Sequence, residues 1–458
     1  MNVLAKPHPR IRLGACAPLL ILLVGIAAYA NSFQGAMVLD DESSIVLNPR
    51  IHHLWPVWHV LTDTTRPLVQ LSIALNYALG GLNVFGYHVV NLTIHLCAAL
   101  VLYGLVRRTA HSTGLALSAA LLWVVHPLQT QSVTYIAQRA ESLTGLWYLL
   151  TLYALARGWY AVSVLACFAG MATKPVMATA PLMAWLYDRV FLAGSWRTAW
   201  RVRRGYYLGL AGSLAVLVFL LITASREYSW AAGFSLQERS LSDYALTQPG
   251  VILQYLRLAV WPHPLVLDYA WPVAATWVDV LPPLAVLAVM GWLVWRAWRM
   301  HPAIGFLGVA AALLLAPTSS VIPITDLAQE HRMYLPLVPL LLLAVLAGAR
   351  GLQLIWPTHL RRQRVVAGLL VSALVLTFGV MTQHRNQDYR SELAIWQDTV
   401  RKRPMNPRAH NNLGVALAQQ GSLDEAFAHF SEALRLNPSD PDAFHNFTRL
   451  LARQDHPK

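Results

Sequence analysis

Charged residues are scarce in this chain. They make up 12% of its 458 residues, whereas hydrophobic residues make up 56%. Soluble globular proteins carry about 25% charged residues, so this composition excludes an ordinary soluble domain. We therefore expect an all-α, polytopic membrane protein whose apolar segments form a helix bundle.

Cysteine is also rare. The three cysteines, Cys16, Cys97 and Cys167, all lie within apolar segments. This placement excludes a disulfide framework and is typical of cysteines that act as small apolar residues. The sequence also lacks a metal-ligand spacing, a glycine-rich phosphate loop and a nucleophile elbow, so no such motif identifies a reaction.

Acidic residues are fewer than basic ones, and the two kinds fall on different loops. The chain has 22 acids against 35 lysines and arginines, a formal net charge of +13. If the apolar segments alternate in direction, one set of short loops holds many arginines and a single acid, Asp188. This asymmetry predicts that these loops are cytoplasmic, together with the N-terminal Lys6, Arg10 and Arg12. The charge therefore follows membrane topology and does not indicate nucleic acid as a partner.

The apolar segments predict about eleven transmembrane helices. The first, at residues 13–33, is long enough to span a bilayer and is expected to be an uncleaved signal anchor. Residues 51–82, with Trp55 and Trp58, suit helices that lie in the membrane interface. Residues 255–271 are broken by Pro262 and Pro264 and are more easily interfacial or re-entrant than spanning. The odd number of spans places the C-terminus on the non-cytoplasmic side.

The chain divides into a membrane domain at residues 1–384, with an external loop at 34–86, and a polar region at 385–458. The polar region repeats with a period of 34 residues. Equivalent residues stand 34 positions apart in the pairs Pro404 and Pro438, Pro407 and Pro441, Ala409 and Ala443, Asn412 and Asn446, and Trp396 and Phe430. This is the period and pattern of tetratricopeptide repeats. One complete repeat with partial neighbours is too few to stand alone, so we expect it to pack on the membrane domain or on a partner.

Ionisable residues gather on the predicted external side. The first loop contains Asp40, Asp41 and Glu42 within a turn or two of the membrane surface. The same side holds a further set at the ends of apolar segments: Arg66, His126, Arg139, Glu141, Lys174, Glu330, His331 and Arg332. Several cations and carboxylates near a membrane face suit a reaction in which an anionic phosphate leaves and an acceptor hydroxyl loses a proton.

Each of these residues also has a structural alternative. The acids of the first loop could begin a solvated loop, and the cations at helix ends could snorkel to the interface. His126 precedes a proline and could simply form hydrogen bonds at a helix end. Arg139 and Glu141 are two positions apart and do not face each other on a helix, so mutual pairing is not the easy explanation.

The combination of motifs resembles a known enzyme family. The acidic first loop is followed by RPLVQLSIALNYALGGLNVFGYHVVNLTIHL, HPLQTQSVTYIAQRAESLTGLWYLLTLY and EHRMYLPLVPL, and then by the repeats. Together they resemble the transmembrane and tetratricopeptide-repeat O-mannosyltransferases and their bacterial relatives, over nearly the whole chain. More distantly, the membrane part resembles the GT-C superfamily. The resemblance implies transfer of a sugar from a polyprenyl-phosphate donor to an acceptor hydroxyl, with periplasmic repeats on a bacterial inner-membrane protein.

The resemblance also implies roles for individual residues. Asp40 or Asp41 is expected to act as the base or to orient the acceptor, and Glu141 falls where relatives place a second acid. The expected ligands of the donor phosphate are Arg66, Arg139, Lys174 and Arg332, and the supporting residues are Glu42, His126, Glu330, His331 and Tyr334. Asp40 and Asp41 could also bind a divalent cation, but their ligand set is incomplete. Animal members carry long repeat arrays, in contrast to the single complete repeat of this chain.

Other functions are compatible with the composition. A non-enzymatic scaffold would use the repeats to recruit envelope proteins. Such a scaffold needs only one transmembrane helix as an anchor, so the many predicted spans argue against it. A transporter or flippase usually places ionisable residues near the bilayer midplane, whereas these lie at the ends of their segments. Within the enzyme interpretation, a lipid or glycan acceptor competes with a protein serine or threonine, and inversion at the anomeric carbon is expected.

Overall fold

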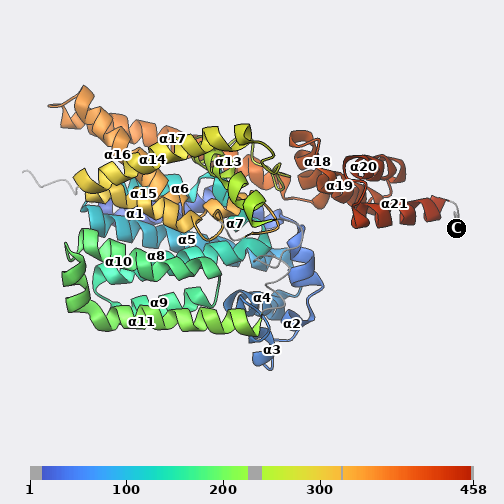
Figure 1. Ribbon diagram of the computed structural model, residues 1–458, viewed down its shortest axis with the longest axis horizontal. Coiled ribbons are helices and arrows are strands. Elements are labelled where there is room, and N and C mark those ends of the chain that lie inside the picture. Colours follow the sequence, from blue (N-terminus) through green and yellow to red (C-terminus); the bar gives the residue numbers. More distant parts are fainter. Residues whose placement is uncertain (1–12, 225–239, 321–322, 455–458) are drawn as a thin grey trace, which may run out of the picture.

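The described secondary-structure elements of this computed structural model are all helices, as Figure 1 shows. The structure describes residues 13–224, 240–320 and 323–454. The N-terminal cations Lys6, Arg10 and Arg12 lie outside this part of the chain. The all-α prediction is confirmed for the described residues.

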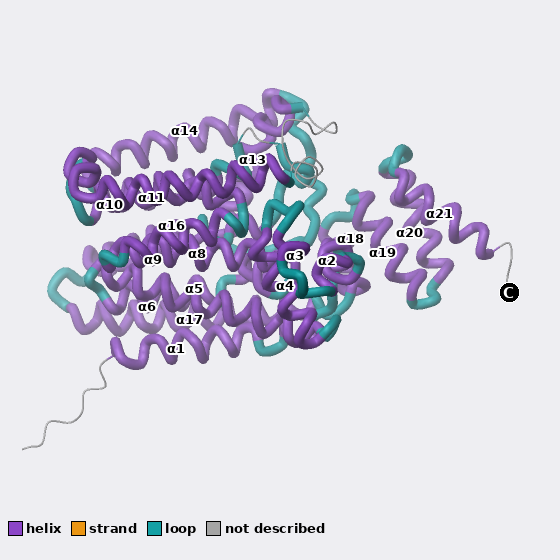
Figure 2. Tube along the Cα trace, turned by 90° about the horizontal axis from the view of Figure 1, so that it is seen from below, coloured by secondary structure: helices purple, strands orange, loops and turns teal. Residues whose placement is uncertain are grey.

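The membrane domain is a bundle of helices that run side by side (Figures 1 and 2). Its long helices are α1 (Leu13–Tyr29), α5 (Val84–Ala110), α6 (Thr113–Val124), α8 (Arg139–Arg157), α9 (Tyr160–Met171), α10 (Ala180–Phe191), α11 (Trp196–Thr223), α13 (Leu241–Val260), α14 (Trp277–Met300), α15 (Pro302–Leu315), α16 (Leu337–Ile355) and α17 (Leu360–Asp388). Residues 261–276, which include the two predicted helix-breaking prolines, form a loop between α13 and α14.

Six of these helices are long and apolar enough to cross a membrane, namely α1, α5, α11, α14, α16 and α17. The helices α6, α9 and α15 are apolar but shorter. The chain is therefore a multi-pass membrane protein, and the predicted number of about eleven spans is not confirmed. Cys16, Cys97 and Cys167 are all free, which agrees with the expectation that they form no disulfide framework.

The centre of the bundle holds the segment before α16 in a fixed position. The Trp123 indole on α6 donates to the Tyr334 carbonyl at 3.1 Å, and the Tyr334 hydroxyl lies 2.9 Å from His95 Nδ1 on α5. Gly145 on α8 allows this packing, since a Cβ at that position would overlap the Tyr334 ring. The residues just before Tyr334 are thereby held against α5, α6 and α8.

The external loop and the repeats lie at one end of the bundle (Figure 1). The loop folds into the short helices η2 (Glu42–Val46), α2 (Pro49–His52), α3 (Trp58–Leu61) and α4 (Pro67–Gly80). The repeat region consists of α18 (Glu392–Lys402), α19 (Pro407–Gln419), α20 (Leu423–Leu436) and α21 (Pro441–Gln454). Figure 2 shows these last helices stacked beyond the end of the bundle.

The repeats pack on the membrane domain, one of the two arrangements predicted for so short an array. Lys402 Nζ donates to the Leu265 carbonyl at 2.8 Å, and Asn406 Nδ2 donates to the Asp268 carbonyl at 3.2 Å. The amide of Ala36 donates to the Tyr389 carbonyl at 2.9 Å. The first helices of the repeat region are therefore fixed beside both the external loop and the loop between α13 and α14.

Candidate active site

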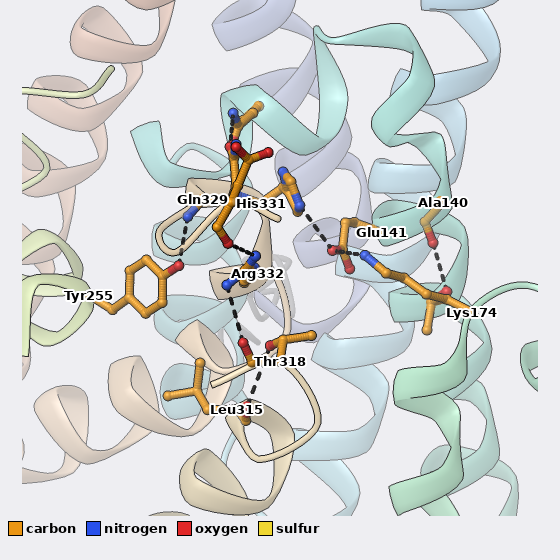
Figure 3. Close-up of polar contacts among 12 residues, drawn as sticks. Ala140, Glu141, Lys174, Tyr255, Leu315, Thr318, Gln329, His331 and Arg332 are labelled. Atoms are coloured by element: carbon orange, nitrogen blue, oxygen red, sulfur yellow. Dashed lines mark hydrogen bonds and ion pairs between the residues drawn. The ribbon is translucent and has the colours of Figure 1, made fainter. Parts of the chain in front are cut away.

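Basic side chains lie on either side of one carboxylate, that of Glu141 (Figure 3). Glu141, in the first turn of α8, forms an ion pair with Lys174, which precedes the short helix η5 (Pro175–Thr179). His331 Nε2, in η6 (Glu330–Met333), lies 3.7 Å from the same Glu141 oxygen. Arg66 and Arg332 are close enough to act electrostatically on both Lys174 and His331. We call Arg66, Lys174, Arg332, His331 and Glu141 the cation cluster.

The cation cluster has an excess of positive charge. Burial lowers the pKa of the Lys174 amine, Arg66 and Arg332 act in the same direction, and Glu141 opposes them. Burial and the same neighbouring cations hold the pKa of His331 well below its usual range, so this imidazole is neutral at physiological pH. Three basic side chains therefore face one carboxylate, an arrangement suited to binding an anion.

The two arginines of the cluster are held differently. Arg332 donates to the carbonyls of Thr318 and Leu327, both at 3.1 Å, and of Asp326 at 2.5 Å, as Figure 3 shows in part. Arg66 lies at the N-cap of α4 and is half-buried, and its side chain has no hydrogen bond or ion pair with any described residue. Arg66 is thus the cluster cation that is most available to a ligand.

The two aspartates of the first loop have contrasting environments. Asp41 is fully buried, and its carboxylate accepts hydrogen bonds from the amides of Val38 at 3.0 Å and Ala137 at 2.6 Å. Burial raises the pKa of Asp41 to about 8, against the opposing effect of these amides. Asp40 is exposed, and its amide donates to the Tyr135 hydroxyl at 2.8 Å. The structure thus uses Asp41 to tie the loop to the start of α8 and leaves the Asp40 carboxylate accessible.

Asp326 connects the first loop, the cation cluster and the repeats. Its carbonyl accepts from Arg332, and its carboxylate pairs with Arg408 of α19 at 3.2 Å. Arg408 also lies 3.6 Å from Asp268. The Asp40 carboxylate is close enough to Arg408 to help raise the pKa of its guanidinium. The sequence does not predict Asp326 and Arg408 as site residues, because they are 82 positions apart and no local motif joins them.

Arg139 lies apart from the cation cluster. Its guanidinium is fully buried and donates to Asn91 Oδ1 at 2.6 Å, to the Ser72 carbonyl at 3.0 Å and to the Tyr87 carbonyl at 3.2 Å. It therefore joins α4, α5 and α8. These contacts use the donors that binding a phosphate would require, so the geometry favours a structural role for Arg139.

Two predicted supporting residues have their polar atoms engaged deep within the bundle. His126 is fully buried, with Nε2 3.2 Å from the Ala259 carbonyl and Nδ1 accepting from the Leu128 amide at 3.3 Å. Tyr334 is buried, and its hydroxyl is bonded to His95. Both side chains therefore hold helices together beside the cluster.

The two predicted supporting acids lie in different surroundings. Glu330 is buried and accepts from the Val266 amide at 2.5 Å and the Tyr269 hydroxyl at 2.8 Å. It thus fastens the loop between α13 and α14 beside the cluster. Glu42 is exposed and faces the repeats, close enough to Glu392 of α18 to help raise the pKa of that carboxyl.

An apolar cavity lies within the membrane bundle. It has a volume of about 260 Å³ and is lined by side chains from α5, α6, α8, α10, α15 and α16. The lining includes Leu335, three positions after Arg332, and Thr109 and Ala110 at the C-terminal end of α5. Its lining is almost entirely hydrocarbon, which suits a lipid chain.

Among the described residues, no group of three or more histidines, cysteines, aspartates and glutamates is arranged to hold a metal ion. Asp41 is fully buried and both of its oxygens accept amide hydrogen bonds, whereas Asp40 is exposed, so the two carboxylates do not converge on one ligand set. The residues present therefore do not fit the divalent cation that the adjacent aspartates had suggested.

Known proteins are similar to this chain in its repeats and along most of its length. Residues 385–441 match the family model described as a tetratricopeptide repeat. The chain is 24% identical to the human protein O-mannosyl-transferase TMTC3, over 95% of this chain and 53% of that protein. It is 25% identical to the Caenorhabditis elegans protein O-mannosyl-transferase F38B6.6, over 92% of this chain and 63% of that protein. Over most of its length the chain is thus similar to proteins named as protein O-mannosyl-transferases.

The chain spans about half the length of the curated relatives it matches. Among solved structures, it is similar to the crystal structure of ArnT from Cupriavidus metallidurans bound to undecaprenyl phosphate. That similarity has a TM-score of 0.44 and 18% sequence identity, and covers 95% of this chain and 77% of that one.

Proposed function

We propose that this protein is a GT-C-type membrane glycosyltransferase. It transfers a sugar, mannose, from a polyprenyl-phosphate donor to a serine or threonine hydroxyl of a protein on the external side of the membrane. The observation that carries this proposal is the cation cluster, in which Lys174 pairs with Glu141 and lies within electrostatic reach of Arg66 and Arg332. The O-mannosyltransferase relatives support the choice of mannose and of a protein acceptor.

The charge of the cluster favours the departing phosphate over the intact donor. Three basic side chains outnumber the Glu141 carboxylate, so the cluster carries an excess of positive charge. The donor phosphodiester carries one negative charge, and the phosphate monoester that leaves carries close to two. Attraction to the cluster therefore grows as the glycosidic bond breaks, which lowers the barrier to transfer.

The apolar cavity supplies a place for the polyprenyl chain. Leu335, three positions after Arg332, is one of its lining residues, so in this proposal a lipid inside it directs its phosphate towards the cluster while its chain stays out of water. Burial of isoprenoid carbon contributes about 25 cal/mol per Å² of apolar surface, so even a partly enclosed chain adds substantial affinity.

Asp40 serves as the base in this proposal. Its carboxylate is exposed, whereas the Asp41 carboxylate is buried and holds two backbone amides. The acceptor oxygen attacks the anomeric carbon, its proton passes to Asp40, and the bond from that carbon to the phosphate oxygen breaks with inversion. The electron pair of the broken bond leaves with the phosphate. The phosphate then forms ion pairs with Arg66, Lys174 and Arg332. Asp41 and Arg139 position the surrounding elements.

The proposed arrangement extends to the whole chain. Residues 1–384 form the catalytic membrane domain, with about eleven spans and the external loop at 34–86, and residues 385–458 form a repeat domain that holds the acceptor chain. The N-terminus is cytoplasmic and the repeats are periplasmic, at a bacterial inner membrane. Arg408 of the repeats, close to Asp40 and Asp326, supports delivery of the acceptor to the base.

The test is transfer of labelled mannose from polyprenyl-phosphate mannose to protein, in membranes that contain the wild-type chain or Arg66→Gln. Arg66 has no side-chain partner among the described residues, so the substitution should leave the fold intact and reduce transfer by about 10²-fold, the typical loss when one group that stabilises the transition state is removed. Arg50→Gln, which alters an exposed cation of the same loop paired with Asp63, is the matched control and should retain transfer. Equal transfer by Arg66→Gln and the control would refute the role of the cluster.

A further inference from the structure

A second charged surface lies at the opposite end of the bundle from the repeats, where α10 joins α11. In Figure 1 the chain between α10 and the long part of α11 crosses this end of the molecule. Gly194 has a φ of +73°, a left-handed conformation that lets the chain reverse after α10. Ser195 then caps α11, with its hydroxyl accepting from the Thr198 amide at 3.1 Å.

The first turns of α11 are separated from the rest of that helix by a kink. Arg203 has non-helical dihedral angles, φ −127° and ψ 27°, within α11. Its guanidinium Nη1 donates to both oxygens of the fully buried Asp188 at 2.9 and 3.0 Å, and the Tyr207 hydroxyl donates to the same carboxylate. The kink is thus fixed by a buried ion pair, and residues 196–202 are set at an angle to the long helix.

Aromatic contacts fix the same segment from the other side. The guanidinium of Arg189 on α10 lies 5.3 Å from the Trp196 ring centroid and 5.2 Å from that of Trp298 on α14. Cation–π contacts of this kind contribute attraction between helices that are far apart in sequence. Residues 196–202 are therefore anchored to both α10 and α14.

The outward side of this anchored segment and of the residue just after the kink, Arg204, is basic and aromatic. Arg197, Arg201 and Arg204 are exposed, and none has an ion pair or hydrogen bond with a described residue. Arg197 and Arg201 are four positions apart and so share one face of the helix. Trp200 is 49% exposed and lies on the neighbouring stripe. Tryptophan beside arginine is the pattern of helices that lie at the level of lipid headgroups.

We propose that residues 196–204 bind anionic phospholipid headgroups of the leaflet at this end of the bundle. Arg197, Arg201 and Arg204 pair with lipid phosphates, and Trp200 inserts at the headgroup boundary. Charge complementarity favours an anionic lipid as the partner. The surface has three exposed guanidinium groups, and among the described residues no carboxylate pairs with them. This inference does not depend on sugar transfer. It assigns lipid binding to one defined site, residues 196–204, and not to the arginine-rich loops of this end as a whole.

The test is native mass spectrometry of the purified full-length chain in neutral detergent, with added phosphatidylglycerol or phosphatidylcholine of the same acyl chains. Each arginine near an anionic lipid surface contributes roughly 1 kcal/mol, so the triple variant R197Q/R201Q/R204Q should bind phosphatidylglycerol at least tenfold more weakly than the wild type. The control R361Q/R362Q/R364Q removes the same charge from exposed positions of α17 and should keep the wild-type preference.

Two further measurements distinguish a lipid site at residues 196–204 from a general effect of net charge or of misfolding. The charge-conserving variant R197K/R201K/R204K should recover most of the binding, and size-exclusion profiles should be the same for every variant. Equal losses in the glutamine variant and the control would overturn the proposal, since they would show only a general effect of net charge. Competition by inorganic phosphate at millimolar concentration would also overturn it, because the site would then recognise free phosphate and not a lipid surface.

Discussion

At the residue scale, the adjacent Asp40 and Asp41 differ in role because one side chain is exposed and the other is buried. Asp40 and Asp41 are adjacent in sequence, but the Asp41 side chain points into the protein and meets the Ala137 amide, 96 positions away. The sequence predicts that this acidic loop matters and leaves open which aspartate acts as the base. That choice depends on a contact between distant segments, and no local pattern in the sequence encodes it.

The pH dependence of stability should report on Asp41. The pKa of Asp41 is raised from the ordinary value of 3.8 to about 8 in the folded protein. Between pH 3.8 and pH 8, therefore, the Asp41 side chain is protonated in the folded state and ionised in the unfolded state. Stability contributed by this group is therefore present at low pH and is lost as pH rises towards 8. In Asp41→Asn the side chain cannot titrate, and its amide group faces a backbone donor at a cost of about 1–3 kcal/mol. The difference in Tm between wild type and variant should accordingly be larger at pH 6 than at pH 9, in thermal unfolding in detergent. An unchanged difference would contradict the raised pKa of Asp41.

At the scale of elements, the cation cluster depends on how closely α8 packs against the segment that contains Arg332 and Tyr334. Arg139 braces α8 against α4 and α5, and Gly145 admits the Tyr334 ring. Apolar runs in the sequence predict that helices form here. They could not show that Arg139 serves as a brace, because its partners Ser72, Tyr87 and Asn91 come from two other helices.

Gly145→Ala should destabilise the protein. The added Cβ would overlap the Tyr334 ring, and the tyrosine is fully buried with its hydroxyl bonded to His95, so it cannot move aside. Overpacking of this kind costs about 1–3 kcal/mol and should lower Tm and reduce transfer together. Gly212→Ala on α11 is the control, since nothing lies within 4 Å of its Cβ and alanine favours the helix. Similar Tm values for the two variants would show that the contact is not tight.

At the scale of the whole molecule, a buried ionic network joins the repeats to the membrane domain. Asp398 of α18 accepts from Arg385 of α17 at 2.9 Å and from Lys402 at 2.6 Å, and Lys402 also reaches the Leu265 carbonyl. The 34-residue period predicts the repeats, and within them Asp398 and Lys402 stand four positions apart on one helix face. Local spacing in the sequence could not predict that this network contacts Leu265, because the Lys402–Leu265 hydrogen bond joins residues 137 positions apart.

Asp398→Asn should loosen the junction between the repeats and the membrane domain. The substitution leaves Arg385, whose side chain is 4% exposed, with a reduced set of carboxylate partners, and the loss of one partner from a buried pair costs about 3–5 kcal/mol. We expect a lower Tm and faster proteolysis at residues 389–391, between α17 and α18. Glu432→Gln breaks the exposed pair with Arg435 and should change stability by less than about 1 kcal/mol. Equal proteolysis of the two variants would show that the network does not hold the repeats in place.

The most direct test of the proposed chemistry is mannose transfer by purified protein in liposomes, from polyprenyl-phosphate mannose to a serine- and threonine-containing peptide. Wild type is compared with Asp40→Asn and with Asp63→Asn, which changes an exposed acid of the same loop. If Asp40 is the base, Asp40→Asn should lower the rate by about 10²-fold or more with unchanged Tm, and Asp63→Asn should match the wild type. A wild-type rate for Asp40→Asn would contradict the role of Asp40, and a rate that rises through pH 8 in the wild type would assign the base to Asp41 instead.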